Sequence, residues 1–157
     1  MLFKTSFRLL PLLLVAGLSA QMAPELKIEP QATVKVKRGA AATVTLKASL
    51  PSGFHANSNK PTEAYLIPLT LKWTGGPLQQ DGTTTYPTPT LEKYSFSADK
   101  PISVVTGAFS LVTKFKVPAT TETGTAAQTG TLRFQACNDR MCFPPKTINV
   151  NVTVNVE

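Results

Sequence analysis

Two cysteines in the segment FQACNDRMCFPPK, residues 134–146, are the residues of this chain best suited to chemistry. Cys137 and Cys142 can form a structural disulfide, supply half of a metal site, or exchange electrons with other thiols. In exchange the reacting species is a thiolate, which a neighbouring cation stabilises. Arg140 between the cysteines and Lys146 behind them are therefore candidate modulators.

A double proline follows the second cysteine and restrains the backbone there. Pro144 and Pro145 lack the N–H donors that sheet pairing needs, so the pairing should stop beside the cysteines. We therefore add Pro144 to the candidate modulators, with Cys137 and Cys142 as the reacting groups.

The segment that precedes the cysteines, TLRFQAC at residues 131–137, alternates like a strand. Its apolar residues share one parity and should face a core: Leu132, Phe134 and Ala136. Cys137 has the other parity and is expected on an exposed, outward face. Asn138 and Asp139 favour a turn. We predict a β-hairpin tip with one cysteine on each arm and Cα atoms about 4.5 to 5.5 Å apart.

A disulfide between these cysteines would close a short ring. Loop-closure entropy assigns such a ring only about 2 kcal/mol of stabilisation. A structural disulfide stabilises most where it joins segments that are distant in sequence. The residues therefore favour exchange but leave a structural role open.

A metal site would need further ligands. His55 and Met141 could join the two cysteines in a site for Cu(I) or zinc. No ligand-rich spacing surrounds these residues, so we expect no metal and no other cofactor. His55 lies within GFHANSNKP and is expected in a surface loop or at a strand end.

From Leu26 onward the chain follows a period of two and is interrupted by Gly, Pro, Asn or Asp about every eight to twelve residues. This spacing predicts an all-β sandwich. The last strand has the clearest alternation, with one buried and one exposed face. The expected strands are 34–36, 44–50, 67–73, 109–117 and 147–156.

Two long connections separate these strands. Residues 75–101 are rich in Gly, Pro and Thr, and their prolines would break a central strand, so we expect short edge strands and a long loop. Residues 119–130 are polar and are expected to form a flexible hairpin tip. No internal repeat divides the chain.

The N-terminus has the pattern of a secretory signal peptide. Lys4 and Arg8 precede an apolar run at 9–18 that ends in small residues. The run is about ten residues long, short of the roughly 20 that span a bilayer as a helix. We expect cleavage after Ala20, which leaves residues 21–157 as one exported domain.

The chain is basic, with 16 Lys and Arg against 9 Asp and Glu and a net charge of +7. Two of these cations lie in the expected leader. The others are spread along strands, with no basic cluster among aromatic residues, so nucleic-acid binding is not expected.

The cysteine segment, together with GFHANSNKP and YLIPLTLKW, resembles the N-terminal periplasmic domain of the thiol:disulfide interchange protein DsbD. The resemblance runs from Glu25 to Val156 and is most specific in QAC and CFPP around the cysteines. It implies an immunoglobulin-like antiparallel β-sandwich in the periplasm. It also implies that Cys137 and Cys142 are the redox pair, with Cys142 forming the mixed disulfide with partners.

Members of that family shield their cysteines with an aromatic cap loop. The corresponding segment would be LEKYSFSADK, residues 91–100, with Tyr94 or Phe96 as the lid. The alternative is that both aromatic residues pack in the core of an edge strand.

The resemblance further implies a module with protein-disulfide reductase activity. It would accept electrons from a membrane electron-transfer protein or a thioredoxin-like protein and pass them to periplasmic clients such as oxidised isomerases or cytochrome c maturation factors. Because this sequence lacks a transmembrane or thioredoxin-like part, we expect a stand-alone shuttle, peripheral at most to the membrane. The rival hypotheses are a non-enzymatic secreted binding module with a structural disulfide and a copper-binding module.

Overall fold

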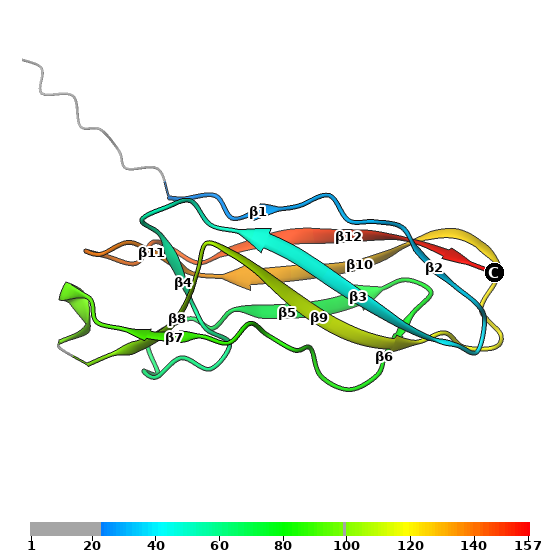
Figure 1. The fold of residues 1–157 in the computed structure, drawn as a ribbon, viewed down its shortest axis with the longest axis horizontal. Helices are drawn as coiled ribbons and strands as arrows, with labels where there is room; N and C mark the ends of the chain where they lie inside the picture. The colour runs from blue at the N-terminus through cyan, green and yellow to red at the C-terminus, as the bar shows by residue number, and fades with distance from the viewer. Residues whose placement is uncertain (1–22, 99) are drawn as a thin grey trace, which may run out of the picture.

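Alternating apolar and polar residues form twelve strands in the part of the chain that the structure describes, residues 23–98 and 100–157 (Figure 1). The structure is a computed structural model. The expected leader, residues 1–20, lies outside the described residues. No helix among the described residues is long and apolar enough to cross a membrane.

The strands form three sheets, two of which pack as a sandwich. The first sheet has the order β1 (Lys27–Ile28), β3 (Ala41–Ser49), β9 (Ala108–Lys116) and β6 (Gln79–Gln80). The second has the order β2 (Val34–Val36), β12 (Lys146–Val156), β10 (Gly124–Phe134) and β5 (Thr70–Gly75). The third has the order β11 (Ala136–Cys137), β4 (His55–Asn57), β8 (Ile102–Thr106) and β7 (Thr90–Glu92). Strand pairs are antiparallel except β2 with β12.

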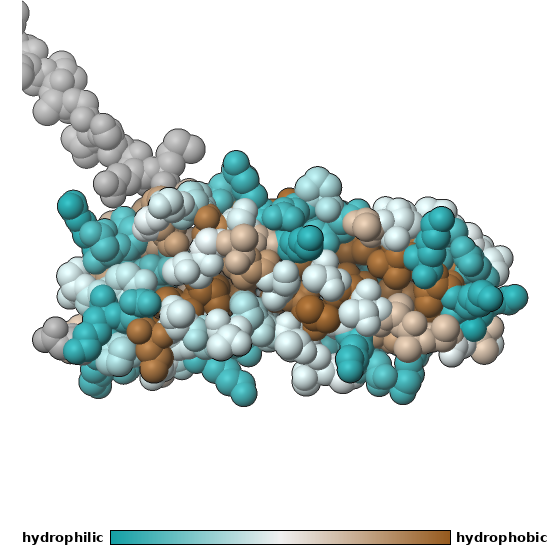
Figure 2. Space-filling model, in the orientation of Figure 1, coloured by the Kyte–Doolittle hydropathy of each residue, from teal (hydrophilic) through white to brown (hydrophobic). Residues whose placement is uncertain are grey.

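One main core fills the space between the first and second sheets. Burial of apolar surface is the chief force that holds such sheets together. Strand β12 buries one parity, as its alternation predicts: Val150, Val152, Val154 and Val156. On the face shown in Figure 2, hydrophilic residues project along the edges and hydrophobic residues appear in patches along the middle. The predicted β-sandwich is confirmed.

One predicted strand, residues 67–73, begins later than expected. Strand β5 starts only at Thr70, because Pro68 has no N–H to donate and the Ile67 N–H bonds a side chain, Oε1 of Gln135, at 3.1 Å. By contrast, residues 75–101 contain the expected short edge strands, β6 and β7, joined by loops.

The expected flexible tip at residues 119–130 is wrong for most of its length. Residues 124–130 belong to β10 and pair in register with β12, from Gly124 opposite Val156 to Gly130 opposite Val150. The polar composition of this segment suggested a loop, but these residues form a strand because the long strand β12 pairs with them. The polar side chain of Gln128 is buried. Only 119–123 remain outside a strand.

The third sheet continues strands of the other two at one end of the molecule. Strand β8 turns at Gly107 into β9, and β10 passes through Gln135 into β11. In Figure 1 this end lies far from the C-terminus. One face of the sheet contributes small apolar residues to the main core: Ala56, Val105 and Ala136. Its other face carries the opposite parity and points away from the core.

Gly76, directly after β5, provides a test of the packing between β5 and β10. It has φ +123°, and an added Cβ would lie 2.6 Å from the Cα of Gln128. We expect Gly76→Ala to lower the free energy of unfolding by about 3 kcal/mol, through backbone strain and overpacking. The matched control Gly82→Ala has φ +85° with no atom within 4 Å, so it should cost about 1 kcal/mol. Equal losses in urea denaturation would contradict the close packing.

Candidate functional site

The two cysteines form a disulfide at the tip of a hairpin. Cys137 opposes Cys142 in an antiparallel bridge, and their Cα atoms are 3.9 Å apart. Next to the bridge, the N–H of Phe143 donates to the carbonyl of Ala136 at 2.9 Å. The predicted hairpin with a cysteine on each arm is confirmed, although the Cα atoms lie closer than expected.

Asn138 organises the turn between the cysteines. Its Oδ1 accepts the N–H groups of Arg140 and Met141, both at 2.9 Å, and its own N–H donates to the Met141 carbonyl at 2.9 Å. Asn side chains commonly stabilise turns in this way. Asp139 and Arg140 are exposed at the tip. The turn is thus held by hydrogen bonds that do not depend on the disulfide.

Gln135 fixes the base of the hairpin, a role that the sequence analysis missed. Its Oε1 accepts from Nδ2 of buried Asn57 at 3.0 Å and from the N–H of Ile67 at 3.1 Å. Its Nε2 donates to the carbonyl of Phe143 at 3.2 Å. One side chain therefore ties the second arm of the hairpin to β4 and to the segment before β5. A glutamine directly before the Ala-Cys pair was the available signal.

Cys137 is fully buried, at 0% exposure, whereas Cys142 is partly exposed. The predicted parity holds, because Ala136 belongs to the main core and Cys137 does not. The prediction that Cys137 is exposed is wrong. Its face of the third sheet lies beneath a second apolar cluster, formed by Leu66, Ile102 and Val104, with Tyr94, Phe96 and Cys142 packed against it.

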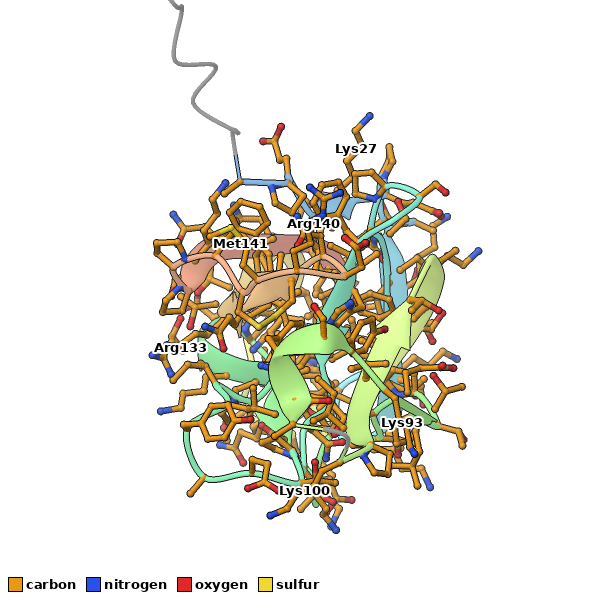
Figure 3. The ribbon with its side chains drawn as sticks, turned by 90° about the vertical axis from the view of Figure 1, so that its left-hand side faces the viewer. Lys27, Lys93, Lys100, Arg133, Arg140 and Met141 are labelled. Atoms are coloured by element: carbon orange, nitrogen blue, oxygen red, sulfur yellow. A yellow bond between two sulfur atoms is a disulfide. The ribbon has the colours of Figure 1, made fainter. Side chains whose placement is uncertain are left out.

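The aromatic residues predicted as a lid belong to a segment that we call the cap, residues 94–98. It contains the 3-10 turn η1 (Ser95–Ser97), so Tyr94 and Phe96 lie outside the edge strand β7. Figure 3 views this end of the molecule, with Arg140 and Met141 of the cysteine turn above the short helical turn. The hydroxyl of Ser95 donates to the carbonyl of Asp139 at 2.8 Å. The cap is thus bonded directly to the cysteine turn.

His55 lies beneath the cap, and the prediction of a surface position for it is wrong. It is 3% exposed, because β4 lies between β11 and β8 in the sheet. Its ring stacks on Tyr94 at a centroid distance of 4.1 Å and on Phe96 at 6.3 Å. Burial lowers the pKa of His55 to about 4, so it is neutral at pH 7. The strand that carries His55 has only three residues, too few for an alternation of apolar and polar residues to predict its burial.

Among the candidate modulators, the structure places only Arg140 between the cysteines, exposed on the turn. Lys146 is directed elsewhere, since its Nζ donates to the carbonyls of Ala23 at 3.4 Å and Pro24 at 3.5 Å. Pro144 is exposed after the second cysteine. Burial, and secondarily the charge of Glu92, raise the pKa of Tyr94.

No group of three or more His, Cys, Asp or Glu residues within 23–98 and 100–157 is arranged to hold a metal ion. A groove of about 550 Å³ does open beside the cysteine turn. Its walls include Leu50, Phe54, His55, Tyr94, Thr106 and Asp139. The groove thus borders the cap at Tyr94 and the cysteine turn at Asp139.

Comparisons with known proteins place the fold. No protein-family model matches the chain, and no curated protein matches its sequence. The solved N-terminal periplasmic domain of ScsB from Proteus mirabilis matches with a TM-score of 0.54 and 13% identity, over 83% of this chain and 46% of that one. The chain therefore spans less than half the length of that structure.

Two further solved structures match at lower scores. The N-terminal domain of Neisseria meningitidis DsbD in the reduced form has a TM-score of 0.48 and 14% identity, over 85% of each chain. The seventh ScaB type I cohesin of Pseudobacteroides cellulosolvens has a TM-score of 0.44 and 15% identity, over 84% of this chain and 92% of that one. With the ScsB match, the three sheets identify the fold as an immunoglobulin-like β-sandwich, and the disulfide lies at one end of it.

Proposed function

We propose that this domain is a periplasmic thiol–disulfide exchange module. Its disulfide accepts electrons from a membrane protein or a thioredoxin-like reductant and passes them to periplasmic client proteins. The observation that carries the proposal is the position of the pair: Cys137 and Cys142 lie outside the main core, under a cap that is bonded to their own turn. The resemblance of the cysteine segment to DsbD supports the same function.

A structural role for the disulfide explains less of this arrangement. The hairpin is already closed by the Phe143 to Ala136 hydrogen bond, by Asn138 and by Gln135. The disulfide adds a ring worth only about 2 kcal/mol in loop entropy. Neither cysteine belongs to the main core. Reduction should therefore leave the sandwich folded, as a working redox pair requires.

The two sulfurs differ in accessibility, and this difference supports different roles for them in the proposed exchange. A partner thiolate attacks Sγ of the partly exposed Cys142, the disulfide bond breaks, and the electron pair stays on Sγ of buried Cys137. A second thiolate of the same partner then attacks the partner sulfur that is bonded to Cys142, that bond breaks, and Sγ of Cys142 leaves with the electron pair. The partner leaves as a disulfide, and the two cysteine sulfurs take up the two protons that the partner thiols released, so the domain holds two thiols.

The cap must move for this attack, because Tyr94 and Phe96 pack in the same cluster as Cys142. That cluster is small, and among the residues that the structure describes the Ser95 hydroxyl makes the direct hydrogen bond from the cap to the cysteine turn. Segments with few buried contacts open at low free-energy cost. The proposed cap therefore shields the disulfide while remaining able to admit a partner.

Reduction in defined redox buffers tests the function. We expect a reduction potential well above about −300 mV, the level below which structural disulfides resist reduction. The measurement equilibrates the purified domain with glutathione or thioredoxin buffers and counts free thiols. The doubly substituted Cys137→Ser, Cys142→Ser protein gives the background. A pair that stays oxidised in strongly reducing buffer would favour the structural disulfide.

Trapping of mixed disulfides tests the roles of the two sulfurs. With Cys137→Ser, the remaining Cys142 should form a mixed disulfide with a thioredoxin-like protein that lacks its resolving cysteine. With Cys142→Ser, the buried Cys137 should trap at least about tenfold less, because access controls thiol exchange. Non-reducing gels and mass spectrometry measure both. Preferential trapping by Cys137 would reverse the assignment.

Substitution in the cap tests shielding. Phe96→Ala removes part of the roughly 1.5 to 3 kcal/mol that burying a Phe provides, so reduction by dithiothreitol should accelerate about tenfold. Leu91→Ala in β7 is the matched control, since Leu91 is 65% exposed and should leave the rate unchanged. Stopped-flow measurement of thiol formation compares the variants. Identical rates of reduction for Phe96→Ala and the wild type would show that the cap does not shield the disulfide.

A further inference from the structure

His55 and Cys137 face the cap together, because they are directly opposed in the pairing of β4 with β11. Opposed residues of an antiparallel pair project on the same face, with Cβ atoms about 4.5 to 5.5 Å apart. Their chain neighbours Ala56 and Ala136, also opposed, project into the main core. The imidazole of His55 and the sulfur of Cys137 therefore lie on the same face of the third sheet, beneath the cap.

Two polar atoms in this space lack hydrogen-bond partners within the described residues. They are Nε2 of His55 and Oδ1 of Asn57, both fully buried. Asn57 lies two residues after His55 on the same strand, so its side chain projects on the same face. Buried polar atoms are normally paired, and unpaired ones often mark a functional requirement. The disulfide state offers no S–H donor to either atom, whereas the dithiol state offers two.

We infer that His55 is the base that takes the proton from Cys137 when the reduced pair delivers its electrons. This inference rests on the proposed exchange function. After Cys142 has formed a mixed disulfide with a client, Cys137 must attack Sγ of Cys142. Nε2 of His55 accepts the Cys137 proton, the Cys137–Cys142 bond forms, and the bond from Cys142 to the client breaks. The client sulfur leaves with the electron pair and takes up the proton from His55.

The surroundings of Cys137 explain why a base is needed there. Cys137 is fully buried, and burial in apolar surroundings disfavours a thiolate. The cluster on this face consists of Leu66, Ile102 and Val104 with the aromatic residues of the cap. None of the three can accept a proton from the thiol.

The charged and titratable groups around His55 leave it free for this role. Tyr94 of the cap stacks on its ring, Cys137 faces it from β11, and Asp139 lies across the groove. From β8 the opposed residue is Thr106, which does not titrate. Burial lowers the pKa of His55 to about 4, so its lone pair is available at pH 7.

The test uses the release of glutathione from Cys142. Reduced protein is mixed with oxidised glutathione, and the resolution of the mixed disulfide by Cys137 is followed from about pH 5.5 to 10 by rapid quenching. His55→Phe, which keeps an aromatic ring on Tyr94 but has no base, should resolve about 100-fold more slowly at pH 7. The deficit should shrink toward the alkaline end of this range, where more of the thiol ionises without a base. Leu91→Ala, at a 65% exposed position of β7, is the control and should match the wild type.

A second measurement holds even if His55→Phe folds poorly. The ¹⁵N resonances of the His55 ring in the wild-type protein should change on reduction, because Nε2 gains a thiol partner. Unchanged resonances, or equal resolution rates and pH profiles in wild type and His55→Phe, would overturn the inference. If glutathione never forms a mixed disulfide with the wild-type protein, the exchange function itself fails, and the two failures are thereby distinguished.

Discussion

The site depends on one constraint, that strands β4 and β11 of the short third sheet are buried on both faces, by clusters of different size. Pairing of β11 with β4 places Ala136 and Ala56 in the main core and Cys137 with His55 beneath the cap. A sheet with one solvated face would expose the disulfide permanently. A sheet with two large cores would make it inaccessible. The small second cluster provides an intermediate degree of protection.

This separation lets the site and the scaffold differ in stability. The main core contains residues from all three sheets, whereas the second apolar cluster is built around three buried residues, Leu66, Ile102 and Val104. Local opening costs less where fewer apolar contacts are lost. The hydrogen bonds of Gln135 and Asn138 that hold the hairpin do not involve the cap, so the proposed opening of the cap would leave them intact. The positions of the sulfurs are thus set by the hairpin, and their exposure in the proposed mechanism is set by the cap.

Sequence periodicity predicted the sandwich, the last strand and the cysteine hairpin, because each of these depends on local alternation and turn residues. It also placed Cys137 on the face away from the main core. It could not reveal that Tyr94 and Phe96 cover that face, since this contact joins segments about forty residues apart. Burial of His55 escaped prediction for the same reason, as its three-residue strand is covered by the cap and flanked by β8 and β11.

The buried histidine also couples the proposed opening of the cap to pH. Burial lowers the pKa of His55 from 6.5 to about 4. Between these pH values, states that expose His55 bind a proton that the closed state does not bind. Acidification through this range therefore favours the open cap, and above about pH 6.5 the histidine is neutral in both states and adds no such bias. Burial of His55 thus has two effects. It keeps the imidazole neutral at pH 7, and it makes the closed state of the cap less stable relative to the open state in acid.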